Sequence, residues 1–130
     1  MKSGKQQTMS ASENGLFVHI PYRPVPKGRP RRSANGGMFT DKRTREFEKL
    51  VSLYCKEAMA IAKKSPLTGP LRCEVHLEDD ECSIMVVQCG GEKSKLRGDI
   101  DNYIKAILDG ANGILFEDDK QIQFLIGEKT

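Results

Sequence analysis

The stretch LRCEVHLEDDECSIMVVQC, residues 71–89, predicts a β-hairpin, and the rest of the fold can be built outward from it. Apolar and polar residues alternate over residues 71–78, with Leu71, Cys73, Val75 and Leu77 on one side. Alternate side chains of a strand point to opposite faces, so this segment is expected to be a half-buried strand. The apolar run of residues 82–89 is the expected neighbouring strand, joined to the first by the acidic turn EDDE.

A long helix is predicted before the hairpin. Its apolar residues recur at spacings of three and four, namely Phe47, Leu50, Val51, Tyr54, Ala58 and Ile61. Thr40 or Asp41 is a suitable N-cap, and the segment KKSP ends the pattern. Upstream, LFVHIPY (residues 16–22) is expected to be a strand, and the proline- and glycine-rich residues 23–37 a loop.

After the hairpin, GDIDNYIKAILDG (residues 98–110) predicts a second helix, capped by Asp101 or Asn102 and stopped by Gly110. The runs ILF (114–116) and QIQFLI (121–126) are expected to be further short strands. These elements together predict a small single α+β (mixed α/β) domain, a mixed sheet with two main helices packed on it. The domain is expected to span residues 15–130, after a disordered tail over residues 1–14.

The composition favours a soluble protein. The chain has 130 residues, 38% of them hydrophobic and 30% charged, and no apolar run near the ~20 residues of a membrane span. No membrane partner is expected, and a cytoplasmic location follows by default; the resemblance described below implies that the cell is bacterial or phage-infected. Reduced thiols are expected at four positions that form no Cys-x-x-Cys pair, Cys55, Cys73, Cys82 and Cys89.

The charges are segregated, although the net charge is only +3. No acidic residue lies between Glu13 and Asp41, a stretch that includes Arg23 and the candidate phosphate-binding residues Lys27, Arg29, Arg31 and Arg32. Lys93, Lys95 and Arg97 precede Asp99 and are candidates to hold a DNA strand; solvated basic loops are the alternative for both groups. From Asp99 to Asp119 the only basic residue is Lys105. A basic arm and an acidic cluster suit chemistry on a phosphodiester.

The acidic cluster predicts a metal site. Asp99 and Asp101 are two residues apart and would share one side of a strand end, whereas Asp101, Lys105 and Asp109 share one side of the helix. Several neighbouring carboxylates repel one another unless a cation neutralises them, and oxygen ligands alone favour Mg²⁺ or Mn²⁺ over zinc. Lys105 would bind the phosphate or the developing charge.

Two other interpretations concern the same residues. An EF-hand is excluded, because its sixth and twelfth positions would be Ile104 and Gly110 rather than glycine and glutamate. The remaining alternative makes Asp101 only a helix cap, Lys105 and Asp109 a solvated pair, and the triplet Glu117, Asp118 and Asp119 a surface turn.

The segments DIDNYIKAILDG and FEDDKQI resemble the signature Asp-x-Asp-Asn-x-x-Lys…Asp-Asp-x-Gln of the RusA family of Holliday junction resolvases, crossover junction endodeoxyribonucleases common in phages and prophages. PVPKGRPRR and FTDKRTREFEKLV are similar to the amino-terminal region of phage-type members, so the resemblance covers residues 16–126. It implies a homodimeric, metal-dependent nuclease of DNA recombination and repair that nicks two opposing strands of a four-way junction. It also implies that Asp99, Asp101 and Asp119 bind the metal and that Lys105 is required. The loop before the acidic pair is about one residue shorter than in some members of the family, which leaves the choice between Asp118 and Asp119 open.

The expected reaction is hydrolysis of a phosphodiester by metal-activated water, without a covalent enzyme intermediate, since no activated nucleophilic side chain is apparent. Two alternatives stay open. One is a junction-binding protein without catalysis, and the other is a related metal-dependent nuclease acting on other branched DNA.

Overall fold

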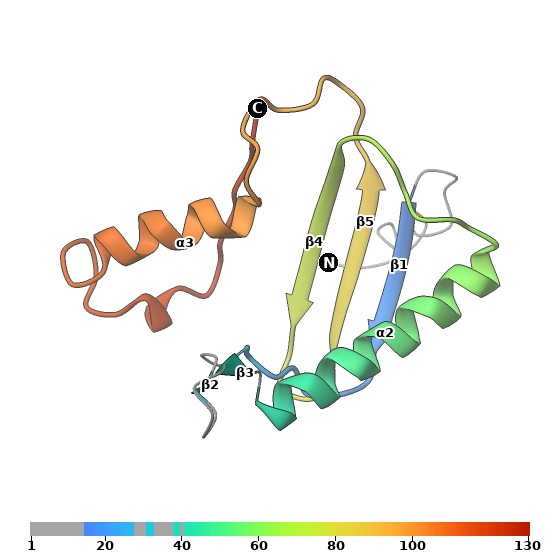
Figure 1. The fold of residues 1–130 in the computed structure, drawn as a ribbon, viewed down its shortest axis with the longest axis horizontal. Helices are drawn as coiled ribbons and strands as arrows, with labels where there is room; N and C mark the ends of the chain where they lie inside the picture. The colour runs from blue at the N-terminus through green and yellow to red at the C-terminus, as the bar shows by residue number, and fades with distance from the viewer. Residues whose placement is uncertain (1–14, 28–30, 33–37, 40) are drawn as a thin grey trace. The chain divides into compact units, whose positions relative to one another are not determined.

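The computed structural model describes residues 15–27, 31–32, 38–39 and 41–130, and it divides the chain into two compact units, residues 1–91 and 92–130 (Figure 1). The predicted tail, residues 1–14, lies outside the described residues. In the described part of the chain, no helix is both long and apolar enough to span a membrane.

The first unit contains a three-stranded sheet in the order β1-β5-β4, built from β1 (Gly15–Ile20), β4 (Leu71–Leu77) and β5 (Cys82–Gln88). Val18 of β1 and Val75 of β4 both pair with Ile84 of β5. The α+β class, the hairpin and the strand near residue 16 are confirmed. Both pairings are antiparallel, where a mixed sheet was expected, because a tight turn joins β4 directly to β5 and β1 runs antiparallel on the other side of β5.

The predicted long helix is α2 (Lys42–Ala62). Asp41 is its N-cap: its side chain accepts hydrogen bonds from the Arg43 N–H (3.1 Å) and from the buried Thr44 hydroxyl (2.9 Å). The helix ends where Lys63 adopts the left-handed conformation, with φ of 55°.

The core lies between α2 and the adjacent half of the sheet. Its buried residues are Val18, Ile20 and Cys82, and the half-buried side chains that pack on them include Phe47, Val51, Tyr54 and Ala58 of α2. The apolar periodicity of α2 was therefore a correct guide to its buried side except at Ile61, which is 77% exposed. All four cysteines are free thiols, as expected.

Strand β4 differs from the prediction, because all of its residues are exposed. Val75 is 60% exposed and Leu77 65%, although the register places them on the same side of the sheet as core residues Ile84 and Cys82. The expectation of a half-buried strand was wrong. Helix α2 packs against β1, and β4 lies at the opposite edge of the sheet.

The predicted loop of residues 23–37 contains a short element. Strands β2 (Arg31–Arg32) and β3 (Met38–Phe39) pair antiparallel just before α2 begins. Arg31 and Arg32 of the basic segment are therefore paired, through their backbone, with Phe39 and Met38.

The second unit consists of α3 (Ile100–Ala111), the short 3₁₀ helix η1 (Asp119–Gln121) and the segments around them (Figure 1). Helix α3 continues through Gly110, which was expected to stop it, and ends at Asn112. The runs 114–116 and 121–126 are not strands; an isolated bridge between Asn112 and Phe116 is the only strand-like pairing described there. These runs lack the neighbouring strand that would satisfy a ladder of backbone hydrogen bonds. The packing of α3 on the sheet stays a prediction.

Candidate active site

The N-cap residue of helix α3 is Asp99, not the expected Asp101 or Asn102. Asp99 is extended, with φ of −73° and ψ of 141°, and its carbonyl oxygen accepts hydrogen bonds from the N–H groups of Asn102 and Tyr103. Its carboxylate makes no capping hydrogen bond. The Asp99 side chain is therefore exposed at the start of the helix and does not stabilise it by a capping hydrogen bond.

The backbone next to Asp99 is held from two sides. The Gly98 N–H donates a hydrogen bond to the Tyr103 hydroxyl (3.0 Å), and the Lys129 ammonium donates to the carbonyl oxygens of Gly98 (2.9 Å) and Leu96 (3.4 Å). A Cβ atom on Gly98 would lie 3.1 Å from the Tyr103 ring, so glycine is the residue that fits closely there. These contacts determine the position of Asp99 through its neighbours.

The C-terminal segment of the unit runs back along α3 to make this contact. A Cβ atom on Gly127 would collide with the Ile104 side chain, and the Ser94 hydroxyl donates a hydrogen bond to the Thr130 carbonyl oxygen (3.0 Å). Sequence reasoning missed the roles of Tyr103 and Lys129. Lys129 lies about thirty residues from its partners, and no local pattern links them, whereas Tyr103 one turn after Asp99 could have been noticed.

Asp101, Lys105 and Asp109 all lie on α3, as predicted, and all are exposed. In the described residues no ion pair joins Lys105 to either aspartate. The solvated i,i+4 ion pair between Lys105 and Asp109, which the alternative interpretation expected, is therefore not formed. The Lys105 ammonium is available for an external anion.

The acidic pair that follows α3 has two different environments. Asp118 is the N-cap of η1: its carboxylate accepts from the Lys120 N–H (3.0 Å), and the Gln121 side chain completes a capping box. The Lys120 N–H lowers the pKa of the Asp118 carboxyl, and a hydrogen bond shared with the Asp119 side chain lowers it further, against a partial desolvation. Asp119 is half-buried, and its own N–H donates to the Asn112 side chain (3.1 Å).

The predicted metal ligands therefore form two pairs. Asp99 and Asp101 lie at the start of α3, and Asn112 ties the backbone of Asp119 to the other end of that helix, which is ~18 Å long at 1.5 Å per residue. Over the described ranges, no three of the predicted acids have carboxylate oxygens within 4.8 Å of one another. Their joint binding of one ion stays a prediction.

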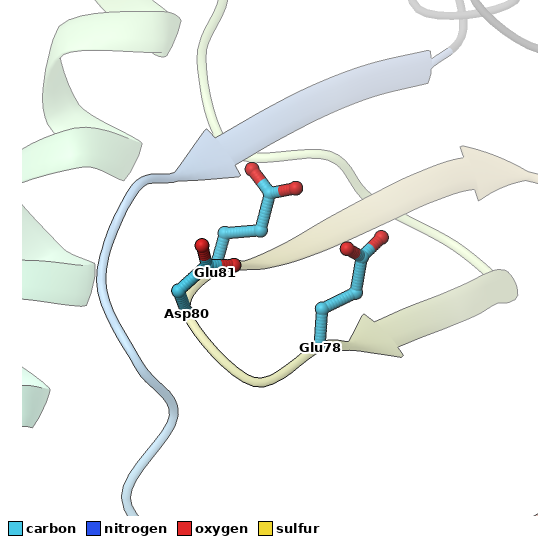
Figure 2. Close-up of side chains that lie close together, drawn as sticks. All are labelled: Glu78, Asp80 and Glu81. Atoms are coloured by element: carbon cyan, nitrogen blue, oxygen red, sulfur yellow. The ribbon is translucent and has the colours of Figure 1, made fainter.

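The one group of three acids that meets this distance in the described part of the chain lies elsewhere. Glu78, Asp80 and Glu81 occupy the turn between β4 and β5, and Figure 2 shows their carboxylates on this loop. Two of them contact histidines: His19 Nε2 lies 2.6 Å from Glu81, and His76 Nε2 lies 3.3 Å from Glu78. The hydrogen bond from His19 is the largest cause of a lowered pKa at Glu81. These pairs explain the cluster as stabilisation of the turn, although its oxygens could also hold a metal.

The predicted DNA-binding residues are only partly described. The Lys27 ammonium pairs with Glu48 of α2 (3.1 Å), the backbone of Arg31 and Arg32 forms β2, and Arg29 lies outside the described residues. The other basic residues expected to bind DNA are exposed in the segment before α3, namely Lys93, Lys95 and Arg97.

Comparison with known proteins supplies the family. No curated protein and no solved structure gives a significant match. A family model described as endodeoxyribonuclease RusA matches residues 21–130, a range that includes β5, α2, α3 and every predicted site residue. The chain therefore belongs to the RusA family of endodeoxyribonucleases.

Proposed function

We propose that this protein is a Mg²⁺- or Mn²⁺-dependent endonuclease that resolves four-way DNA junctions by paired nicks. The observation that carries the proposal is the family match over residues 21–130. That range contains the acidic residues around α3 together with the basic loop and the basic residues before Asp99.

The donor set suits a hard divalent cation. Asp99 and Asp101 offer two exposed carboxylates within one helical turn, and Asp99 makes no capping bond that a cation would have to replace. Mg²⁺ is commonly held by one or two carboxylates, with water and phosphate oxygens completing its shell. Asp99, Asp101 and Asp119 would hold the ion, with Asp118 as the alternative or additional acid. When bound, the ion supplies charge that makes water easier to deprotonate and that offsets negative charge on the phosphate.

The side chains of the protein bind and orient the DNA. Lys105 follows Asp101 by one helical turn, a rise of ~6 Å, so both side chains can reach one phosphodiester. Lys93, Lys95 and Arg97 hold the strand that enters the site, and the loop with Lys27, Arg29, Arg31 and Arg32 contacts phosphates of a neighbouring arm. Water is the nucleophile, because the proposed site residues include no activated Ser, Cys or His side chain.

A homodimer accounts for paired nicks. A four-way junction presents two equivalent strands related by a two-fold axis, and two copies of one chain related by the same symmetry place one site at each strand. Sedimentation at micromolar concentration should give twice the chain mass of 14.5 kDa. A monomer that still makes paired nicks would contradict this part of the proposal.

The test is cleavage of a synthetic four-way junction with and without Mg²⁺, with linear duplex as the control substrate and Asp101→Asn as the control protein. Paired nicks that require both the metal and Asp101 support the proposal. Junction binding without cleavage in either Mg²⁺ or Mn²⁺ would favour the non-catalytic alternative. Equal cleavage of flaps or duplex ends would favour a nuclease for other branched DNA.

A further inference from the structure

One side of α2 carries basic residues that the predicted DNA-binding set does not include. At ~100° per residue, Arg45, Lys49, Ser52 and Lys56 project within a narrow sector of the helix, and all four are exposed. The side chains that pack on the sheet project on the opposite side: Phe47, Val51, Tyr54 and Ala58. We name the four exposed residues the α2 stripe.

The α2 stripe keeps its positive charge. Across the described residues, Arg45, Lys49 and Lys56 take part in no ion pair. Two acids beside the stripe are paired with other cations, since Glu46 lies 4.0 Å from Lys42 and Glu48 lies 3.1 Å from Lys27. For the third, Glu57, no ion pair is described. The three cations of the stripe therefore have no ion-pair partner among the described residues.

The surface is also continuous and connected to the basic loop. The four stripe residues line an open hollow together with Glu48 and Leu53, and Glu48 is the acid that Lys27 neutralises. Lys27 belongs to the segment that leads into β2, so the base of the basic loop lies against the same helix.

We infer that the α2 stripe binds the phosphate backbone of duplex DNA in an arm of the substrate, an inference that rests on the proposed DNA substrate. Arg45 and Lys56 are eleven residues apart, a rise of ~16.5 Å, which corresponds to about five base pairs of a duplex at ~3.4 Å of helix axis per base pair. Lys49 and Lys56 each carry an ammonium group at the end of a long flexible side chain, and Ser52 adds a hydroxyl donor between them. The contact is with phosphate, so it carries no sequence preference.

The test compares two double variants of the full chain with the same change in net charge. Lys49→Gln/Lys56→Gln removes charge from the stripe. Arg43→Gln/Arg72→Gln removes charge from the other side of α2 and from β4, at residues that the stripe does not include. Affinity for a four-way junction and for linear duplex is measured without divalent metal over a series of salt concentrations. Circular dichroism and thermal melting of both variants verify the fold.

The expected result is a loss of ~2 in the slope of log affinity against log salt for the stripe variant, since each phosphate contact contributes ~0.9. The slope of the control variant should fall by less than about 0.5. Equal slopes for the two variants would overturn the inference, and if wild type still cleaves junctions the proposed function would stand. If the two variants show the expected difference in slope but the wild-type protein never cleaves junctions, the inference stands and the proposed catalysis is overturned.

Discussion

Three aspartates begin helices in the described part of this chain, and only one of them does not cap its helix. The carboxylates of Asp41 and Asp118 accept hydrogen bonds from the first turns of α2 and η1, whereas that of Asp99 caps nothing in α3. A capping aspartate usually stabilises a helix by ~1 kcal/mol. A side chain that omits this contribution, while its backbone neighbours are firmly held, is placed well for a ligand outside the protein.

The stability of aspartate variants should follow this difference. Asp41→Ala removes the bonds from the Arg43 N–H and the Thr44 hydroxyl and should lower the free energy of unfolding by about 1–2 kcal/mol. Asp99→Ala should change the free energy of unfolding by less than about 0.5 kcal/mol. It should nevertheless reduce junction cleavage at least ~100-fold, because loss of a residue that only contacts a metal ligand already costs up to ~100-fold. Urea denaturation and a cleavage assay measure the two effects. A destabilised Asp99→Ala protein would show that Asp99 serves the fold.

Substitutions of the two aspartates after α3 should also distinguish a role in stability from a role in cleavage. Asp119→Asn should reduce cleavage more than Asp118→Asn, because one Asp118 oxygen is engaged with the Lys120 N–H. Asp118→Ala should lower stability instead, since it removes the cap of η1. Cleavage rates at saturating Mg²⁺ and urea midpoints distinguish the two roles. Greater loss of cleavage in the Asp118→Asn protein would reverse the assignment.

At the scale of elements, two glycines have opposite requirements, Gly98 just before α3 and Gly110 within it. A Cβ atom at Gly98 would press on the Tyr103 ring, whereas a Cβ atom at Gly110 would meet nothing within 4 Å. Gly110 lies inside the helix, where glycine is less favourable than alanine by up to ~1 kcal/mol.

Alanine substitutions test both positions. Gly110→Ala should raise the free energy of unfolding by up to ~1 kcal/mol and leave cleavage unchanged. Gly98→Ala should displace Tyr103 and the adjoining Asp99 and reduce cleavage about 10- to 100-fold, since small misplacements at a reacting centre are costly. Thermal melting and cleavage rates measure the two effects. Full cleavage activity in Gly98→Ala would show that the Tyr103 contact does not position Asp99.

At the scale of the whole molecule, two of the described ion pairs connect β1 and the residues after it to a turn that lies far away in sequence. His19 of β1 contacts Glu81 in the turn between β4 and β5, and Arg23 contacts Asp79 in the same turn. The first of these pairs provides a pH-dependent contribution to stability, because the pKa of Glu81 is lowered in the folded protein.

The sign of that contribution follows from linkage. A carboxyl with a lowered pKa stabilises the fold above its ordinary pKa of ~4.3, and this stabilisation disappears as the pH falls through the lower folded value. Glu81→Gln should therefore be less stable than wild type at about pH 6, and the difference should shrink as the pH falls below ~4.3 and through the lowered pKa of Glu81 in the folded protein. Urea midpoints at several pH values measure it, with Glu92→Gln, an exposed acid for which no ion pair is described, as the control. A difference that persists at low pH would contradict the role of the ionised Glu81.

The amino-acid sequence by itself determined the elements whose patterns are local. The alternation of residues 71–78 predicted β4, and the apolar run of residues 82–89 predicted β5. The spacing of Phe47, Val51, Tyr54 and Ala58 predicted the length and the buried side of α2. Periodicity and caps involve residues within a few positions of one another, so they are legible in the chain itself. The acidic signature indicated the family for the same reason, and the family match confirms it.

Only the tertiary structure decided which predicted faces have partners. Alternation alone could not show that β4 lies at the edge away from α2, that the run 121–126 lacks a neighbouring strand, or that Lys129 holds the backbone beside Asp99. Each depends on residues that are distant in sequence and on the path of the chain between them. Burial and hydrogen bonding across such distances are properties of the assembled fold, and the local sequence does not contain them.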